Sequence, residues 1–366
     1  MKIGVPKEII SQEYRVGINP ITAQLLVENS HEVFVENNAG IHSGYNNSDY
    51  QQAGCTILDK AVDVFDAAEL IVKVKEPSFE EVELLKNKII FTYLHLSSSK
   101  ELTEKLLNCN TTGIAYETVN IDNELPMLKP MSAIAGRLAI LDCIPLLKKN
   151  NQGKGKLISG TSLADPANVI ILGAGIVGVN ALEMSLGLGA NTTILDINEE
   201  RLAVIKESYP KANTMISTSE TINELLPNAD IVIGAVLTVG AKPPTLITRE
   251  MLKLMQPKSI LSDVSIDQGG CFETSKATTH DNPTYEVDGI IHYCVRNIPS
   301  AVPFTATNAL NEATRPYILY LANNGLVGLK DNSELKMGLN TYKGHLLNKE
   351  VAEAHSLNHS NPNKIL

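Results

Sequence analysis

The stretch NVIILGAGIVGVNALEMSLGLGANTTILDIN, residues 168–198, opens with a short apolar run that a glycine ends. A run of this kind predicts a strand that is buried on both faces. Gly173, Gly175 and Gly178 follow in G-x-G-x-x-G spacing, and a helical segment then leads to a second apolar run that ends at Asp196. The stretch therefore predicts a strand–turn–helix–strand unit of about 30 residues that binds a dinucleotide.

Each part of this unit has a role in dinucleotide binding. Gly173 allows a sharp turn off the strand, Gly175 lets the backbone approach a pyrophosphate, and Gly178 lets the helix pack closely on the sheet. The N-terminus of the helix offers N–H groups and a positive dipole to the phosphates. Asp196 would accept hydrogen bonds from the ribose hydroxyls and repel a 2′-phosphate, so the sequence predicts NAD in preference to NADP.

Apolar runs and helical segments also alternate through the first ~125 residues, which is typical of an α/β domain with a parallel sheet. We therefore predict an α/β fold with two doubly wound, parallel-sheet, Rossmann-like domains and an active-site cleft between them. The segment after a long predicted helix, 305–323, is too short for a third domain. It is expected to return and pack on the first domain.

Composition and charge narrow the class of protein. Hydrophobic residues make up 43% of the 366-residue chain, and the net charge of −10 argues against a nucleic-acid-binding surface, which needs basic clusters. The five cysteines are scattered without a C-x-x-C pair, which favours reduced thiols over a disulfide framework or a zinc site. The carboxylates likewise show no metal-ligand spacing. Because no stretch of about 20 apolar residues occurs, we expect a soluble, cytoplasmic protein without a membrane partner.

Three polar side chains stand where predicted strands of the first domain end. Arg15 follows the first strand, Lys75 closes the LIVKVK strand, and His95 follows the IIFTYL strand. Active sites in open α/β sheets lie beyond the carboxyl ends of the strands, so these side chains are expected to converge. Their alternative roles are a surface arginine, a lysine that reaches solvent and a histidine satisfied in a core. Lys73, on the same face as Lys75, is interpreted as structural.

Asp267 has a comparable position in the second domain. It follows a predicted buried strand, 259–266, and precedes Gly269 and Gly270, where the backbone can come close to a ligand. Its alternative role is that of a turn aspartate that caps neighbouring N–H groups. Both its carboxylate and the imidazole of His95 suit proton transfer, and the residues leave open how the two would divide that work.

Several further motifs occur in one order along the whole chain. They are VPKE with E-x-RVGINP at 5–20, KVKEP at 73–77, FTYLHL at 91–96, AYET at 115–118, PMSAIAGRLA at 130–139, IGAVL at 233–237, SIDQGGCFE at 265–273 and VRNIPSAVP at 295–303. Together with the glycine motif, they make the chain resemble the bacterial alanine dehydrogenase family over essentially its full length.

The resemblance implies the NAD-dependent, reversible oxidative deamination of L-alanine to pyruvate and ammonium. It also implies a homohexamer, with a substrate domain of residues 1–127 and 304–366 around an NAD-binding domain of residues 128–303. Matching motif positions assign substrate binding to Arg15 and Lys75, and catalysis to His95 and Asp267. They assign NAD contacts to Ser132, Gly173, Ala174, Gly175, Ile176, Val177, Gly178, Asp196, Arg201, Ser217, Val236, Leu237, Ile266, Asp267, Val295, Asn297 and Ile298.

Two other functions are weighed against this one. The chain also resembles the soluble NAD-binding component of proton-translocating transhydrogenase, but it has no membrane helices of its own and it keeps the substrate residues. A catalytically inactive, NAD-binding regulator is the alternative from another class. The presence of Arg15, Lys75, His95 and Asp267 argues against it.

Overall fold

The structure is a computed structural model that describes residues 1–122, 124–236 and 243–365. The chain divides into two compact units. The first comprises Met1–Met131 with Ser300–Leu366, and the second comprises Ser132–Pro299. Both chain ends therefore belong to the first unit.

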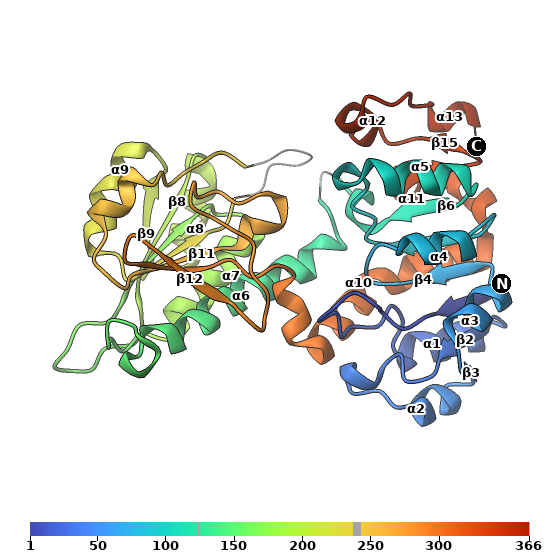
Figure 1. The fold of residues 1–366 in the computed structure, drawn as a ribbon, viewed down its shortest axis with the longest axis horizontal. Coiled ribbons are helices and arrows are strands. Elements are labelled where there is room, and N and C mark those ends of the chain that lie inside the picture. The colour runs from blue at the N-terminus through green and yellow to red at the C-terminus, as the bar shows by residue number, and fades with distance from the viewer. Residues whose placement is uncertain (123, 237–242, 366) are drawn as a thin grey trace. The chain divides into compact units, whose positions relative to one another are not determined.

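An eight-stranded sheet forms the centre of the first unit (Figure 1). Six strands, β1–β6, run parallel. The C-terminal strand β14 pairs antiparallel with β6, and β15 pairs antiparallel with β14 at the edge of the sheet. The order is β15-β14-β6-β5-β4-β1-β2-β3. The strand bounds are β1 Lys2–Val5, β2 Glu32–Glu36, β3 Thr56–Leu58, β4 Leu70–Val72, β5 Ile89–Thr92, β6 Thr112–Ala115, β14 Leu339–Tyr342 and β15 His345–Leu346.

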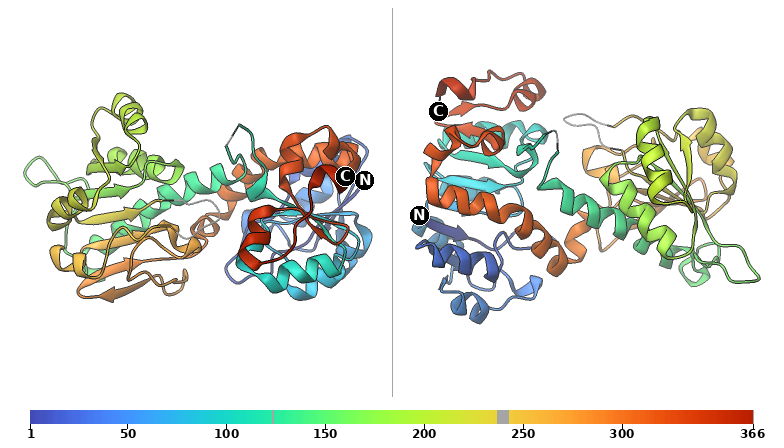
Figure 2. Two further views of the ribbon diagram at one scale, coloured as in Figure 1. Left: turned by 90° about the horizontal axis from the view of Figure 1, so that it is seen from above. Right: turned by 180° about the vertical axis from the view of Figure 1, so that it is seen from behind.

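Helices cover both faces of this sheet. Figure 1 shows α4 and α5 on the near face, and the view from behind in Figure 2 shows the long helix α10 on the other. Apolar side chains from α3, α4, α5 and α12 share one core with strands β4–β6. The helix bounds are α1 Pro20–Glu28, α2 Asn47–Gln52, α3 Ala61–Ala67, α4 Phe79–Leu84, α5 Lys100–Asn108, α10 Pro303–Asn324, α11 Ser333–Gly338, α12 Lys349–His355 and α13 Pro362–Ile365.

The second unit is built on a seven-stranded sheet in the order β12-β13-β11-β10-β7-β8-β9. All of its strands are parallel except β12, which pairs antiparallel with β13 at one edge. The strand bounds are β7 Asn168–Leu172, β8 Asn191–Asp196, β9 Asn213–Ile216, β10 Ile231–Gly234, β11 Ile260–Asp263, β12 Thr284–Val287 and β13 Ile290–Tyr293. The helices are α6 Leu128–Leu147, α7 Ile176–Gly187, α8 Glu199–Ser208 and α9 Ser219–Leu225.

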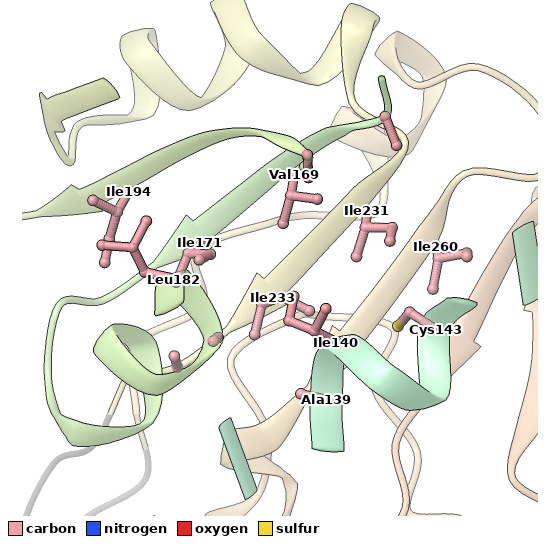
Figure 3. Packing of buried hydrophobic residues seen from close by; sticks show 14 of the residues in the cluster. Ala139, Ile140, Cys143, Val169, Ile171, Leu182, Ile194, Ile231, Ile233 and Ile260 are labelled. Atoms are coloured by element: carbon pink, nitrogen blue, oxygen red, sulfur yellow. The ribbon is translucent and has the colours of Figure 1, made fainter. Parts of the chain in front are cut away.

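The central strand β7 is buried on both faces, as its apolar run predicts. Val169 and Ile171 belong to a core with α6 and α7, whereas Ile170 and Leu172 belong to the core on the opposite face. Figure 3 shows residues of the first of these cores, with Ala139, Ile140 and Cys143 of α6 and Leu182 of α7 directed at the strands. Alternate side chains of one strand thus join two cores, which requires helices on both faces.

Both sheets have the strand order of a doubly wound fold. In each unit the first strand and the two that follow it in the chain lead outward to one side. Later strands lead outward on the other side: β4, β5 and β6 in the first unit, and β10, β11 and β13 in the second. The point where the order reverses lies between β1 and β4 in the first unit, and between β7 and β10 in the second. Ligands of such sheets bind beyond the carboxyl ends of the strands at this point. The predicted α/β class with two doubly wound sheets is confirmed, although each sheet carries antiparallel edge strands that were not predicted.

The expectation that no stretch of about 20 apolar residues occurs is wrong for α6, which is long and apolar enough, by length and composition, to cross a membrane. It contains Arg137 and Asp142, and its inner side, with Ala139, Ile140 and Cys143, lies in the core of the second unit. In this structure α6 is therefore a core helix of a folded unit. All five cysteines of the chain are buried and unpaired, as the scattered sequence positions predict.

Candidate active site

The glycine motif forms a tight turn between β7 and α7. Gly173 has a φ of +106°, and a Cβ placed on it would lie 2.5 Å from the carbonyl oxygen of Ala235. A Cβ on Gly178 would lie only 1.8 Å from the carbonyl oxygen of Gly173. Any larger side chain at either position would force the turn apart. Beside Gly175, by contrast, a Cβ would meet no atom within 4 Å, so open space adjoins the N-terminus of α7.

Asp196 ends β8 next to this turn and is 7% exposed. Its Oδ2 accepts a hydrogen bond from the N–H of Ala174 at 2.7 Å, and its Oδ1 accepts one from the N–H of Asn198 at 2.9 Å. Arg201 Nη1 forms an ion pair with Oδ2 at 3.2 Å. A carboxylate has about four acceptor sites, so it can still accept from ribose hydroxyls. The open turn, the helix N-terminus and this carboxylate together fit NAD.

The segments that follow β10, β11 and β13 are tied to one another. Ser265 Oγ donates to the carbonyl oxygen of Val236 at 2.7 Å, and the N–H of Asn297 donates to Asp267 Oδ2 at 3.4 Å. These bonds link the segment that contains Ile266 and Asp267, two of the predicted NAD contacts, to Val236 and to the predicted stretch 295–298. Asp267 itself is exposed, so its carboxylate is accessible to a ligand.

The strand predicted over 259–266 ends earlier, at Asp263, and Asp267 lies in a 3₁₀ turn, η7 (Val264–Gln268). The cause is the carboxylate of Asp263, which accepts hydrogen bonds from the N–H groups of Ser265 at 3.0 Å and Cys271 at 2.9 Å. Burial raises the pKa of Asp263, and the hydroxyl of Ser275, which donates at 2.5 Å, opposes this shift. Asp263 therefore holds together the two ends of the loop that contains Asp267.

The other cofactor-binding residues predicted from the sequence occupy strand ends or helix starts. Ser217 follows β9, and its N–H donates to the carbonyl oxygen of Asp196 at 3.0 Å. Ile176 and Val177 begin α7, and Ser132 lies in the second turn of α6. Val295 and Ile298 are buried beyond the end of β13. Leu237 lies outside the described residues.

In the first unit, Arg15 is only 3% exposed, which rules out the alternative of a mobile surface arginine. Glu13 holds its guanidinium in a fork: Nε donates to Oε1 at 2.7 Å and Nη2 donates to Oε2 at 2.5 Å. On the other side, Nη1 donates to Met131 Sδ at 3.0 Å. Burial alone would lower the pKa of Arg15, but the charge of Glu13 raises it, so the guanidinium stays charged. A fixed, buried cation of this geometry suits a carboxylate ligand.

The strand predicted over 70–75 ends at Val72, and the segment after it is held by Glu8. Oε1 of this buried carboxylate accepts hydrogen bonds from the N–H of Val74 at 2.6 Å and of Lys75 at 3.3 Å. Lys75 is half-buried. Its ammonium group makes no ion pair with any residue in the described part of the chain. It is therefore available to a ligand at the point where the strand order reverses.

Lys73, the neighbouring lysine, is fully buried and structural. Its Nζ lies 2.7 Å from Glu81 Oε1 and 3.4 Å from Glu8 Oε2. Burial alone would lower the pKa of Lys73, but these two carboxylates raise it and keep the ammonium charged. The same residue Glu8 thus joins the buried ion cluster to the backbone of Lys75.

His95 follows β5 in a left-handed backbone conformation, with a φ of +47°. The carboxylate of Glu117 accepts a hydrogen bond from its N–H at 2.6 Å. The imidazole is half-buried and stacks on the ring of Tyr93, with 5.9 Å between ring centroids and 17° between planes. Among the described residues no hydrogen bond to either ring nitrogen is present. The alternative of a histidine satisfied in a core does not apply.

Tyr93 lies close to both Arg15 and His95. Besides stacking on His95, its buried hydroxyl donates to the carbonyl oxygen of Met127 at 2.5 Å, while Arg15 contacts Met131 one turn further on. Burial raises the pKa of Tyr93, and the nearby positive charge of Arg15 opposes this shift. The structure therefore brings Arg15 and His95 to one region of the first unit.

The sequence did not single out the side chains that hold this region in place. They are Glu8, Glu13, Tyr93 and Glu117, and each belongs to one of the motifs VPKE, E-x-RVGINP, FTYLHL and AYET. The motifs marked these positions, but the partner of each carboxylate is set by the fold.

Comparison with known proteins covers nearly the whole chain. Residues 4–135 match the model of the alanine dehydrogenase/PNT N-terminal domain, and residues 139–349 match that of the C-terminal domain. The chain is 47% identical to the alanine dehydrogenase of Methanococcus maripaludis, over 100% of both chains. It is also 47% identical to the alanine dehydrogenase of Staphylococcus haemolyticus, over 98% of each.

Solved structures of similar proteins also superpose on nearly the whole chain. An L-alanine dehydrogenase structure superposes with a TM-score of 0.94 at 44% identity, covering 97% of this chain and 99% of that one. A transhydrogenase structure from Sinorhizobium meliloti superposes with a TM-score of 0.81 at 22% identity, covering 95% of this chain and 99% of that one. The second match shows a shared fold alone.

Proposed function

The chain belongs to the alanine dehydrogenase/PNT family, and we propose that it is an NAD-dependent alanine dehydrogenase that converts L-alanine reversibly to pyruvate and ammonium. The observation that carries the proposal is the group at the strand ends of the first unit. There a buried, oriented Arg15 and the imidazole of His95, whose ring nitrogens make no hydrogen bond within the described residues, lie close to Tyr93. A carboxylate anchor beside a proton-transfer group is what a 2-amino or 2-oxo acid requires.

The residues of the first unit would hold the substrate. Arg15 binds the substrate carboxylate through its guanidinium, which Glu13 orients. Lys75 donates to the carbonyl oxygen of pyruvate and stabilises negative charge on it. His95 exchanges a proton through its ring with the water that adds to or leaves the substrate carbon. Asp267, in the second unit, is the other proton-transfer group proposed.

The residues of the second unit would hold the cofactor. Gly173 to Gly178 and the N-terminus of α7 take the pyrophosphate, and Asp196 takes the ribose hydroxyls. When bound, NAD accepts the hydride from the substrate carbon. Hydride transfer needs the substrate carbon that gives up the hydride and the nicotinamide carbon that accepts it to lie at roughly 3–3.5 Å from each other. The proposal therefore includes a cleft between the domains in which substrate and NAD meet.

The remaining parts of the proposal concern assembly and location. We propose a soluble, cytoplasmic homohexamer without nucleic-acid, membrane or metal partners, in which residues 1–127 and 304–366 bind substrate and 128–303 bind NAD. The test of the activity is an absorbance assay at 340 nm with purified protein, L-alanine and NAD, and with pyruvate, ammonium and NADH in reverse. Absence of turnover in both directions, with NADH still bound, would favour a regulator instead.

Arg15→Ala is expected to raise the KM for pyruvate by about 10–10²-fold, because a charge-assisted hydrogen bond contributes about 1.5–3 kcal/mol. NADH binding should change little. Because Arg15→Ala also leaves Glu13 without its buried partner, Arg15→Lys is the second variant: it keeps the charge and loses the planar fork. Initial rates over a pyruvate series measure both variants. A wild-type KM in folded Arg15→Ala protein would remove Arg15 from the substrate site.

Asp196→Ala is expected to lower the preference for NAD over NADP by about tenfold or more. The change removes the acceptor of the ribose hydroxyls and releases Arg201 from its ion pair, so the guanidinium can meet a 2′-phosphate. The ratio of kcat/KM with the two cofactors measures the effect. Glu199→Ala, at an exposed carboxylate in the first turn of α8, is the control and should leave the ratio unchanged. An unchanged ratio in Asp196→Ala would place the ribose elsewhere.

A further inference from the structure

We propose that Glu117 is a positioning residue for His95, holding the proton-transfer imidazole in place through the backbone. This inference rests on the proposed function, because it concerns the same reaction. Glu117 lies in η3 (Tyr116–Thr118), directly after β6, which is the neighbour of β5 in the sheet. Its carboxylate therefore reaches across the sheet edge to the segment that carries His95.

Within the described residues, the hydrogen bonds to the Glu117 carboxylate come from backbone N–H groups. Oε1 accepts hydrogen bonds from the N–H of His95 at 2.6 Å and of Leu94 at 3.1 Å, and Oε2 accepts from Leu94 at 3.2 Å. Among the residues that the structure describes, Glu117 provides the only acceptor for these two N–H groups. Carboxylate acceptors make stronger hydrogen bonds than neutral ones, so one side chain fixes two successive peptide groups.

The backbone at His95 needs such a restraint. A residue with a Cβ rarely adopts a φ near +47°, because the left-handed region brings Cβ too close to the neighbouring carbonyl oxygen. This conformation persists only where the surroundings enforce it. Rotation of His95 back to a right-handed φ would turn its Cα–Cβ bond and move the imidazole off the ring of Tyr93.

The residues that follow His95 are held by other side chains. Ser98 donates to the carbonyl oxygen of His95 at 2.7 Å through Oγ. The carbonyl oxygen of Leu96 accepts from Thr103 Oγ1 of α5 at 3.2 Å and lies 2.7 Å from His355 Nε2 of α12. These bonds fix the segment after His95, whereas Glu117 fixes the segment before it. Loss of Glu117 therefore frees the φ of His95 without unfolding the loop.

The role of Glu117 is distinct from that of a proton-transfer group. If its carboxylate moved protons, Glu117→Gln and Glu117→Ala would lose activity equally. If it positions His95, the amide oxygen of Gln can still accept from both N–H groups, and only Ala removes the restraint. A displacement of about 1 Å at a reacting group costs about 10²-fold in rate.

The experiment compares Glu117→Ala and Glu117→Gln in the full-length protein. We expect Glu117→Ala to lower kcat for L-alanine by about 10²-fold, with KM for pyruvate and NADH fluorescence titration little changed. Glu117→Gln should lose less than about tenfold, since it keeps the acceptor. The control is Glu69→Ala, whose carboxylate also holds a backbone N–H of this sheet, that of Lys2 at 2.9 Å, at the opposite end of the strands. Its kcat should stay at the wild-type value.

A double-mutant cycle with His95→Ala decides whether Glu117 acts through the histidine. In the His95→Ala background, Glu117→Ala should add less than about threefold to the loss, because the positioned group is gone. A full 10²-fold further loss, or equal inactivity of the Gln and Ala variants, would overturn the inference. So would near-normal kcat in Glu117→Ala. Wild-type protein without alanine turnover would instead refute the proposed function, so the two failures are distinguishable.

Discussion

His95→Ala is expected to lower alanine-dependent turnover by about 10²–10⁴-fold, the usual contribution of one proton-transfer group. The imidazole lies at the end of β5, and within the described residues neither ring nitrogen is engaged by the protein. Its proposed work is therefore chemical and not structural. NADH binding should remain near the wild-type value, because the phosphates are assigned to the glycine turn of the second unit.

The measurement combines steady-state rates in both directions with NADH fluorescence titration. His345→Ala is the matched control: it removes an exposed histidine of the same unit, in β15, and should leave both readouts unchanged. A loss of turnover with equal loss of NADH binding would indicate a structural role. If the folded variant kept near-normal alanine oxidation, proton transfer would have to be assigned to Asp267.

The class of the fold follows from the sequence because its signals are local. The apolar run before Gly173, the glycine spacing and Asp196 lie within one stretch, and the structure places each as predicted. The antiparallel edge strands β12, β14 and β15 were missed. They are short, and β14 joins the sheet by pairing with β6, more than 200 residues earlier in the chain. No local pattern encodes such a pairing.

Two strands near the site end earlier in the structure than the sequence predicts, and the reason is physical. The stretches 73–75, KVK, and 264–266, VSI, follow apolar runs and keep apolar side chains at Val74, Val264 and Ile266, so the sequence extends both strands through them. In the structure, carboxylates take the backbone N–H groups that a strand would use: Glu8 takes those of Val74 and Lys75, and Asp263 takes that of Ser265. Predicting this requires knowing which acidic side chain is buried beside which peptide group.

The contrast between local sequence signals and contacts that the fold creates also applies to the site residues. Arg15, Lys75, His95 and Asp267 stand at or after the ends of predicted strands, which needs only the order of elements, and the motif resemblance then assigned their roles. Glu8, Glu13 and Glu117 act on partners through contacts that the fold creates, over separations of up to 67 residues. A recurring arrangement results, in which a carboxylate holds the backbone or guanidinium of each proposed substrate residue.

Lys73→Met is expected to lower the free energy of unfolding by about 3–5 kcal/mol at neutral pH, because it leaves two buried carboxylates without their cation. Lys73 is 0% exposed and contacts both Glu8 and Glu81. Methionine has a similar length, so the loss arises from charge more than from packing. Because Glu8 also holds the N–H of Lys75, alanine turnover should fall as well.

The destabilisation should depend on pH in a defined direction. Burial already raises the pKa of Glu8, and the charge of Lys73 opposes that rise, so removal of Lys73 raises this pKa further. A carboxyl group with a raised folded-state pKa contributes stability below its unfolded pKa and loses it as the pH rises through the folded value. The difference in the free energy of unfolding between variant and wild type should therefore be largest at about pH 8 and shrink toward about pH 5 as Glu8 takes up a proton.

Urea unfolding of both proteins at these two pH values measures the effect, with Lys100→Met as the control. Lys100 forms an exposed i,i+4 pair with Glu104 at 3.9 Å, in the same unit, and pairs of this kind contribute little to stability. Its replacement should leave the unfolding midpoint unchanged at both pH values. A Lys73→Met protein as stable as wild type at about pH 8 would show that the charge of Lys73 makes no net contribution to stability. In that case the buried cluster would not set the position of the proposed substrate lysine through charge.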